Sequence, residues 1–199
     1  MICQVSCVAI IGLGNPGIRY AETRHNLGFW LIDKFAQSQK VSFREKSQYC
    51  SEIVKVNYSN KSFMLVKPLT YMNESGKFLK NLLLKNNCEV SETIIIHDEI
   101  TLPVGRMKIS KSNGDGGHNG VKSVFSAIGN NLARLRLGIG QKRNPSMDLA
   151  DYVLSKFASE EIQILQQQKE NFLDALKSLM SEGIDRSMNR YNQTSPNTI

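Results

Sequence analysis

The chain has 199 residues, of which 41% are hydrophobic and 22% charged, and it carries a formal net charge of +7. This size predicts one domain with a buried core, and the lack of an apolar run of about 20 residues argues against a membrane-spanning protein. The sequence starts without the features of a signal peptide, so we expect a cytoplasmic protein, and its positive charge fits either a polyanionic partner or an ordinary basic surface.

The first half of the chain alternates between strand and helix patterns. Residues 5–14 form a short β-branched run that ends in glycine, which predicts a buried strand. Residues 27–39 place apolar side chains at helical spacing, with Asn26 as the expected N-cap. Residues 51–68 predict two strands joined by a turn, and residues 70–87 lead into a second helix.

The second half continues this alternation around a glycine-rich loop at residues 112–120. Its elements are expected at residues 93–99 (strand), 105–111 (strand), 121–131 (helix), 133–140 (strand) and 159–183 (helix). Ser159 is the expected cap of the last helix, and Gly183 is expected to end it. The pattern predicts a single α/β domain over residues 1–183, with a twisted, mixed and largely parallel sheet between helices. Residues 184–199 are expected to be a mobile tail with little to pack.

The motif GLGNPG at residues 12–17 contains the GxGxxG pattern of dinucleotide-binding proteins. That pattern requires a helix that opens on the pyrophosphate and an acidic residue about 20 positions later. Here NPG predicts a tight turn, and the nearest acidic candidate, Asp33, falls inside the predicted first helix. We therefore expect the glycines to shape a turn that holds Asn15 at the end of a strand.

The cysteines and histidines do not form a metal-binding pattern. Cys3, Cys7, Cys50 and Cys88 are scattered without a CxxC pair, which predicts four ordinary thiols and no disulfide framework. The chain has three histidines and no HExxH motif. We expect neither a metal nor a cofactor.

Polar side chains occur where predicted strands end and predicted helices begin. In an α/β fold these positions face a common crevice, where ligands bind. The candidates are Asn15, His25, Asn26, Asn73, Asp98, His118 and Asn119. Each has a structural alternative, because asparagine is common in turns and N-caps and a single histidine or aspartate is more often structural than catalytic.

The pairing of His25 with Asp98 predicts hydrolysis of an acyl bond by activated water. A histidine oriented by a carboxylate can accept a proton from water near neutral pH, and amide donors can stabilise the oxyanion that forms. A serine nucleophile is not favoured, because the sequence has no GxSxG motif.

Six blocks of the sequence resemble the bacterial-type peptidyl-tRNA hydrolase family, in family order and over about residues 8–157. The blocks are GLGNPGIRYAETRHNLGF, KPLTYMNESG, HDEITLPVG, GDGGHNGVKSV, RLRLGIG and DYVLSKF. The resemblance implies a monomeric, metal-independent esterase that cuts the ester between a peptide and the terminal ribose of tRNA. It implies His25 as the general base and Asp98 as its orienting partner. The groups implied to contact the ester, the water or the peptide are Asn15, Asn73, Asn119, Tyr20 and Tyr71.

Two other function classes remain open at this point. One is a catalytically silent RNA-binding relative, which would keep the fold and the basic surface. The other is a nucleotide-dependent oxidoreductase, which retention of NAD by the purified protein would reveal.

Basic residues near the glycine-rich loop are candidates for contacts with tRNA phosphates, and the alternative is a solvated basic surface. We assign the contacts to Lys108, Lys111 and Arg136. Family members often carry a basic residue near Ser110, and GIGQKRNPSMD departs from the usual proline-containing sequence after GIG.

Overall fold

A mixed seven-stranded sheet runs through the computed structural model, which describes residues 7–111, 114–142, 144 and 146–193. The strand order is β2-β3-β4-β1-β5-β7-β6. The strands are β1 (Cys7–Gly12), β2 (Arg44–Lys46), β3 (Ser51–Tyr58), β4 (Lys61–Pro68), β5 (Ile94–Glu99), β6 (Met107–Lys111) and β7 (Ala133–Gly138). The central strands β4, β1, β5 and β7 pair in parallel, and β2, β3 and β6 pair antiparallel at the sides. The expectation of a mixed, largely parallel sheet is confirmed.

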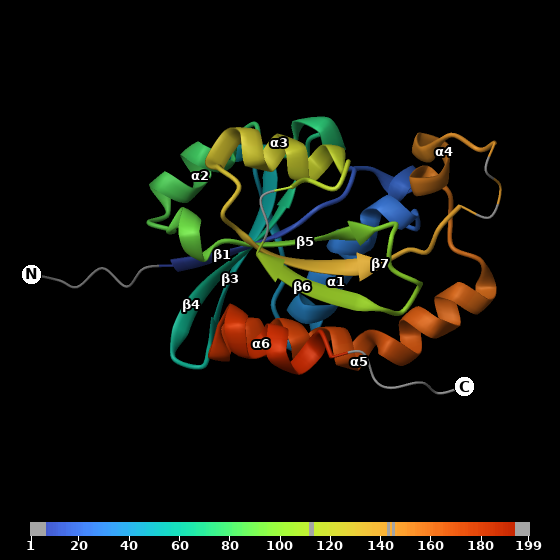
Figure 1. Cartoon of the computed structure of the whole chain (residues 1–199). Coiled ribbons are helices and arrows are strands. Elements are labelled where there is room, and N and C mark those ends of the chain that lie inside the picture. The colour runs from blue at the N-terminus through green and yellow to red at the C-terminus, as the bar shows by residue number, and fades with distance from the viewer. Residues whose placement is uncertain (1–6, 112–113, 143, 145, 194–199) are drawn as a thin grey trace, which may run out of the picture.

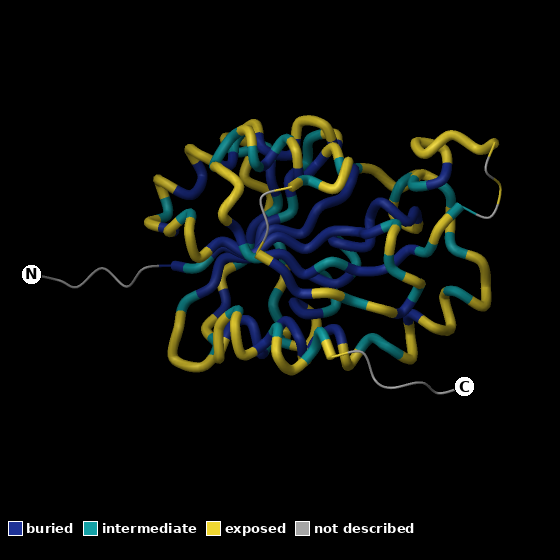
Figure 2. Tube along the Cα trace, in the orientation of Figure 1, coloured by how far each residue is buried: buried dark blue, intermediate teal, exposed yellow. Residues whose placement is uncertain are grey.

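Helices cover both faces of the sheet (Figure 1). They are α1 (Leu27–Ser38), α2 (Leu79–Lys85), α3 (Asn119–Ile128), α4 (Leu149–Leu154), α5 (Ser159–Glu182) and α6 (Ile184–Tyr191). Side chains alternate between the faces of a strand, so Ile10 of β1 packs with α1 and α5, while Ile11 packs with α2 and α3. Figure 2 shows the strands as the buried centre between these layers. In the part of the chain that the structure describes, no helix is long and apolar enough to cross a membrane.

One expected helix cap, Ser159, is wrong, and another, Asn26, stands at the expected position without the capping contact. Asn26 precedes α1 but its side chain makes no capping hydrogen bond, because it binds the backbone of another loop. Ser159 is the first residue of α5 rather than its cap. The helix start is instead held by Glu161, whose carboxylate accepts a hydrogen bond from the Ala158 N–H at 2.8 Å.

The expectation of a tail with little to pack from residue 184 is also wrong. Residues 184–191 form α6, which packs against the edge strand β6. The side chain of Asn192 then pairs with the backbone of Ile109 through hydrogen bonds of 2.7 and 2.8 Å. This contact satisfies backbone groups that an edge strand otherwise leaves unpaired. Residues 194–199 lie outside the described part of the chain.

Candidate active site

Several of the predicted polar residues meet near the carboxyl ends of the parallel strands. His25 lies in a 3-10 turn (Arg24–Asn26) directly before α1, Asp98 is near the end of β5, and His118 precedes α3. They line a hollow of about 310 Å³ together with Asn119 and with Val153 of α4. The fold therefore brings together residues that are 73 and 20 positions apart in the chain.

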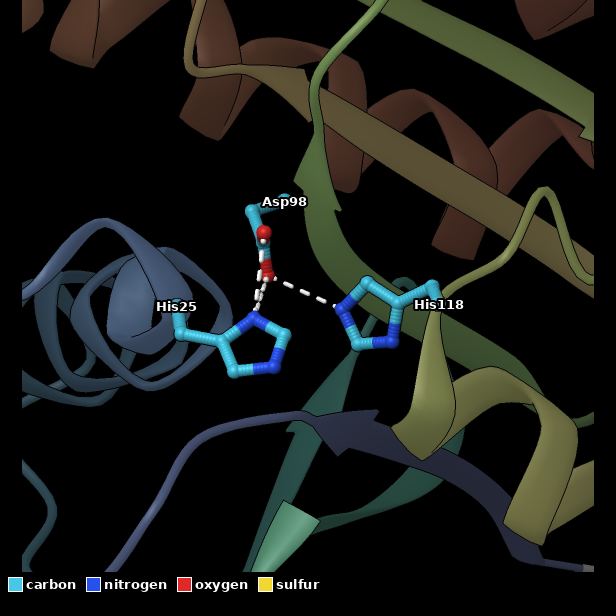
Figure 3. Close-up of side chains that lie close together, drawn as sticks. All are labelled: His25, Asp98 and His118. Carbon is cyan, nitrogen blue, oxygen red and sulfur yellow. Dashed lines mark hydrogen bonds and ion pairs between the residues drawn. The ribbon is translucent and has the colours of Figure 1, made fainter. Parts of the chain in front are cut away.

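His25 and Asp98 form a buried hydrogen-bonded pair (Figure 3). The Nδ1 atom of His25 lies 3.0 and 3.1 Å from the two carboxylate oxygens of Asp98. An ionised carboxylate can only accept, so Nδ1 carries the proton and donates. The Nε2 atom of His25 is then the nitrogen with a free lone pair, as a general base requires.

His118 donates a second hydrogen bond to the same carboxylate. Its Nε2 atom lies 2.9 Å from Asp98 Oδ1, and its Nδ1 atom accepts from the backbone N–H groups of Gly120 and Val121. These two backbone donors fix the proton of His118 on Nε2. His118, rather than Asn119, is thus the cap of α3. The sequence left the role of His118 open.

Electrostatics keep Asp98 ionised. Burial alone would raise the pKa of Asp98, but the neighbouring rings of His118 and His25 and their hydrogen bonds hold that pKa below its usual value. Behind the site, burial and the nearby His118 ring lower the pKa of His97 to about 3. The His97 ring is therefore neutral, and its Nδ1–H donates to the main-chain oxygen of Asp98 at 2.7 Å. Asp98 is thus fixed at its side chain and at its backbone.

The same three groups could in geometric terms approach a metal ion. The ligand atoms of His25, Asp98 and His118 lie within 4.8 Å of one another. Both imidazole nitrogens that face Asp98 carry protons, however, and the Nε2 proton of His118 is fixed by two backbone donors. A metal would have to displace these protons, so the donor set fits a hydrogen-bonded triad better than a coordination sphere.

Asn15 is held in place by a pair of backbone contacts. The side chain of Asn26 accepts from the Asn15 N–H at 2.8 Å and donates to the Asn15 carbonyl at 2.9 Å. The Oδ1 atom of Asn15 accepts from the Met72 N–H at 2.8 Å, which leaves its Nδ2 group to donate. Asn15 lines a different hollow from that of His25. Asn26, which the sequence predicts as a helix cap, therefore holds the backbone of Asn15 in place.

The glycines of the GxGxxG pattern let the loop after β1 pack on α1. A Cβ atom at Gly12 would lie 2.7 Å from the main-chain oxygen of Gly28, and one at Gly14 would lie 2.6 Å from the ring of Phe29. Gly17 has a φ of 99°, which side-chain-bearing residues rarely adopt. Close backbone packing and a turn thus account for the pattern.

Of the remaining predicted substrate-binding residues, Asn119 lines the hollow of His25 and the other three do not. Tyr20 and Tyr71 make an edge-to-face contact with ring centroids 6.5 Å apart, and Tyr71 is 53% exposed. Asn73 is exposed in a 3-10 turn (Met72–Glu74) and does not open α2 as expected. Asn119 is the first residue of α3 and shares the hollow of His25.

The three predicted phosphate contacts are not brought together. Lys108 of β6 is paired with Arg136 of β7 on the sheet face that α3 covers. Lys111 points to the opposite face, where it lines a hollow with Leu179 and Met180 of α5. Alternation of side chains along β6 causes this separation.

Two further observations concern this basic face. The Nη2 and Nε atoms of Arg136 lie 2.6 and 2.9 Å from a carboxylate oxygen of Glu99, which offsets part of its charge. Ser110 is buried opposite Arg134. Of the two cations on this face, Lys108 is exposed and Arg136 is half-buried.

Arg24, the neighbour of His25, is a supporting residue that the sequence did not single out. Its guanidinium binds the carboxylate of Glu161 at 2.6 Å and the main-chain oxygen of Ile139 at 3.1 Å. It also lies 4.7 Å from the ring centroids of both Tyr152 and Phe157. These contacts tie the turn of His25 to α4 and α5. The partners are 137 residues apart, so no local pattern could have revealed them.

Comparisons with known proteins agree with one another. A family described as peptidyl-tRNA hydrolase matches residues 9–198. The chain is 39% identical over 191 residues to the peptidyl-tRNA hydrolase of Thermodesulfovibrio yellowstonii, covering 94% of this chain and 99% of that one. It is 41% identical over 183 residues to that of Fervidobacterium nodosum, covering 92% and 94%. The crystal structure of peptidyl-tRNA hydrolase from Acinetobacter baumannii matches with a TM-score of 0.87 at 30% identity, over 99% of each chain.

Proposed function

The chain belongs to the peptidyl-tRNA hydrolase family, and from this premise we propose how its residues hydrolyse the ester between a peptide and the terminal ribose of tRNA. The relatives and the matching fold support hydrolysis of peptidyl-tRNA, and a silent RNA-binding relative is not favoured. The observation that carries the proposed mechanism is the buried pair of His25 and Asp98, in which Nε2 of His25 keeps its lone pair.

In the proposed reaction His25 acts as a general base. Its Nε2 atom takes a proton from water, and the resulting hydroxide attacks the ester carbonyl carbon. Asp98 stabilises the imidazolium that forms and keeps Nδ1 as the donor, which is the role of the aspartate in a serine-protease triad. When the tetrahedral intermediate collapses, the ribose oxygen leaves and takes the proton from Nε2 of His25. General-base catalysis of this kind contributes about 10²- to 10⁴-fold to a rate.

Amide groups of the site position the ester in this proposal. Asn15 has a free Nδ2 donor because Met72 occupies its oxygen, and Asn119 lies beside His25. Such donors stabilise an oxyanion without reorganising when charge develops. Asn73, Tyr20 and Tyr71 would line the channel through which the peptidyl group approaches. Asn73 and Tyr71 are exposed and Tyr20 is half-buried, which leaves them available for this contact.

The acceptor end of tRNA is the proposed partner, and the enzyme is proposed to act as a monomer in the cytoplasm. The net charge of +7 favours association with a polyanion. Lys108 and Arg136 share one face of the sheet and could neutralise neighbouring phosphates. Lys111 lies on the other face, so we leave it out of this contact.

The test is release of peptide from N-acetyl-aminoacyl-tRNA by the wild-type protein in ¹⁸O-labelled water with EDTA present. We expect release that EDTA does not slow, with one labelled oxygen in the peptide carboxyl and none in the tRNA. Label in the tRNA would contradict attack at the carbonyl. Binding of tRNA without release would instead support a silent RNA-binding relative, and loss of activity in EDTA would point to a metal.

A further inference from the structure

Cys7 and Cys88 are neighbours at the end of the sheet that is remote from His25. Cys7 is the first residue of β1, and Cys88 forms an isolated parallel bridge with it. The Cys7 N–H donates to the carbonyl of the adjacent Asn87 at 3.1 Å. Paired residues of adjacent strands lie about 4.8 Å apart and direct their side chains to the same face. This separation falls within the range that a disulfide spans.

The surroundings of the two thiols make Cys7 the nucleophile of the pair. The neighbouring Cys88 thiol, and to a smaller extent Ser62 and Lys55, lower the pKa of Cys7 against the effect of burial, and the Ser62 hydroxyl oxygen lies 3.9 Å from Cys7 Sγ. The Cys88 thiol donates to the main-chain oxygen of Asn86 at 3.7 Å, and its proximity to Cys7, together with burial, raises its pKa. A thiolate reacts with peroxides and a thiol does not, so the two cysteines have different roles.

We propose that Cys7 and Cys88 are a redox-modification site, at which hydrogen peroxide forms an intramolecular disulfide. The Cys7 thiolate attacks one peroxide oxygen and breaks the O–O bond, which gives a sulfenic acid and hydroxide. The sulfur of Cys88 then attacks the sulfur of Cys7 as its thiol proton leaves, and water departs. In total, two thiols lose two electrons and two protons, and one peroxide becomes two waters.

The position of the pair determines what this bond would do. It would join the start of β1 to the segment between α2 and β5, and so close a loop of most of the first half of the chain. Cross-linking a long loop removes conformations from the unfolded state. The pair lies at the amino end of β1, whereas the loop that follows the carboxyl end carries Asn15. We therefore expect higher stability with unchanged hydrolysis.

The test is a disulfide map in a Cys3→Ser background, because Cys3 and Cys7 share the tryptic peptide 1–19. The full chain is treated with one equivalent of hydrogen peroxide, blocked with an alkylating agent and digested without reduction. We expect peptide 1–19 linked to peptide 86–106, with Cys50 in peptide 47–55 alkylated. The melting temperature should rise by roughly 5–10 °C and return to its starting value in dithiothreitol.

The controls separate a specific pair from general oxidation. Cys88→Ser should abolish the linked peptide and the rise in melting temperature, while Cys50→Ser should leave both unchanged. The map of the peroxide-treated Cys3→Ser protein decides the case even if Cys88→Ser does not fold. Free alkylation of both Cys7 and Cys88, a link from peptide 1–19 to peptide 47–55, or a Cys7 that stops at sulfinic acid would each overturn the proposal.

Discussion

At their carboxyl ends the parallel strands lead to buried polar groups, whereas β1 begins among apolar side chains and two thiols at its amino end. The polar end contains Asp98, held by two imidazole donors, and Asn15, held by Asn26 and Met72. At the other end Cys7 and Cys88 belong to an apolar cluster with residues of α2. Each buried polar group at the polar end needs a hydrogen-bond partner, because a buried group without one lowers the free energy of unfolding by about 1–3 kcal/mol.

This contrast predicts that substitutions at the two ends separate activity from stability. The polar groups at the carboxyl ends of the strands are organised around the carboxylate of Asp98. Changes there should alter the rate of hydrolysis more than the fold. Changes at the amino end should alter the fold and leave the rate unchanged. The cysteine variants described above test the amino end, and the following variants test the remainder of the molecule, from the largest expected effect to the smallest.

Asp98→Asn should lower kcat by about 10³-fold, because an amide facing Nδ1 of His25 favours the tautomer that carries its proton on Nε2. The amide oxygen can still accept from His118, so the fold should persist. Single-turnover hydrolysis and circular dichroism would measure the two effects. A rate and a pH–rate profile like those of the wild type would contradict the pairing of His25 with Asp98.

Arg24→Met should lower kcat by about 10²-fold and destabilise the protein by about 3 kcal/mol, because it breaks the ion pair with the half-buried Glu161 and loosens the turn of His25. The double variant with Glu161→Met is the matched control. It removes the carboxylate that loses its ion pair, so stability should recover in part while the rate stays low; the contact of Glu161 with the Ala158 N–H is lost as well. Recovery of both the stability and the rate in the double variant would show that Arg24 matters only for folding.

His97→Gln should weaken the dependence of stability on pH. In the folded protein the pKa of His97 is about 3, whereas the unfolded chain takes up this proton near pH 6.5. The unfolded state therefore binds more protons below pH 6.5, and stability falls as the pH falls. Between pH 7.5 and pH 5 this contributes roughly 2 kcal/mol, which urea unfolding should find in the wild type and not in the variant. Equal losses of stability in the wild type and in His97→Gln over this pH range would show that His97 is not a buried neutral ring.

Lys108→Ala should raise KM several-fold and reduce the salt dependence of tRNA binding by about one counterion, because a phosphate contact is lost. Lys111→Ala is the matched control on the opposite face of β6, and it should change neither quantity. Equal effects of the two substitutions would mean that net charge, rather than a defined contact, attracts the tRNA.

Patterns local in the sequence predicted most of the fold. Apolar periodicity placed β1, β5, α1 and α5, and the ends of strands and starts of helices placed Asp98 and His25 near one another. The errors concern side chains whose partners are distant in the chain. Asn26 was expected to cap a helix, yet it binds the backbone of Asn15, 11 residues away. No propensity encodes such a contact.

Two further misses have the same origin. The segment after residue 183 is rich in polar residues and has no apolar pattern that predicts packing. It packs on β6 because Asn192 binds the unpaired backbone of this edge strand, and that edge exists only once the sheet has formed. Lys111 was grouped with Lys108 because both precede the glycine-rich loop. The alternation of strand side chains, which the sequence already implied, places them on opposite faces.

The most direct test of the central claim compares His25→Ala with His118→Ala in single-turnover release of peptide from N-acetyl-aminoacyl-tRNA, with tRNA affinity measured in parallel. The account predicts that His25→Ala abolishes release while tRNA affinity is nearly unchanged. His118→Ala, which keeps the pair of His25 and Asp98, should retain part of the rate. Release by His25→Ala at a rate close to that of the wild type would contradict the assignment of His25 as the base that activates water.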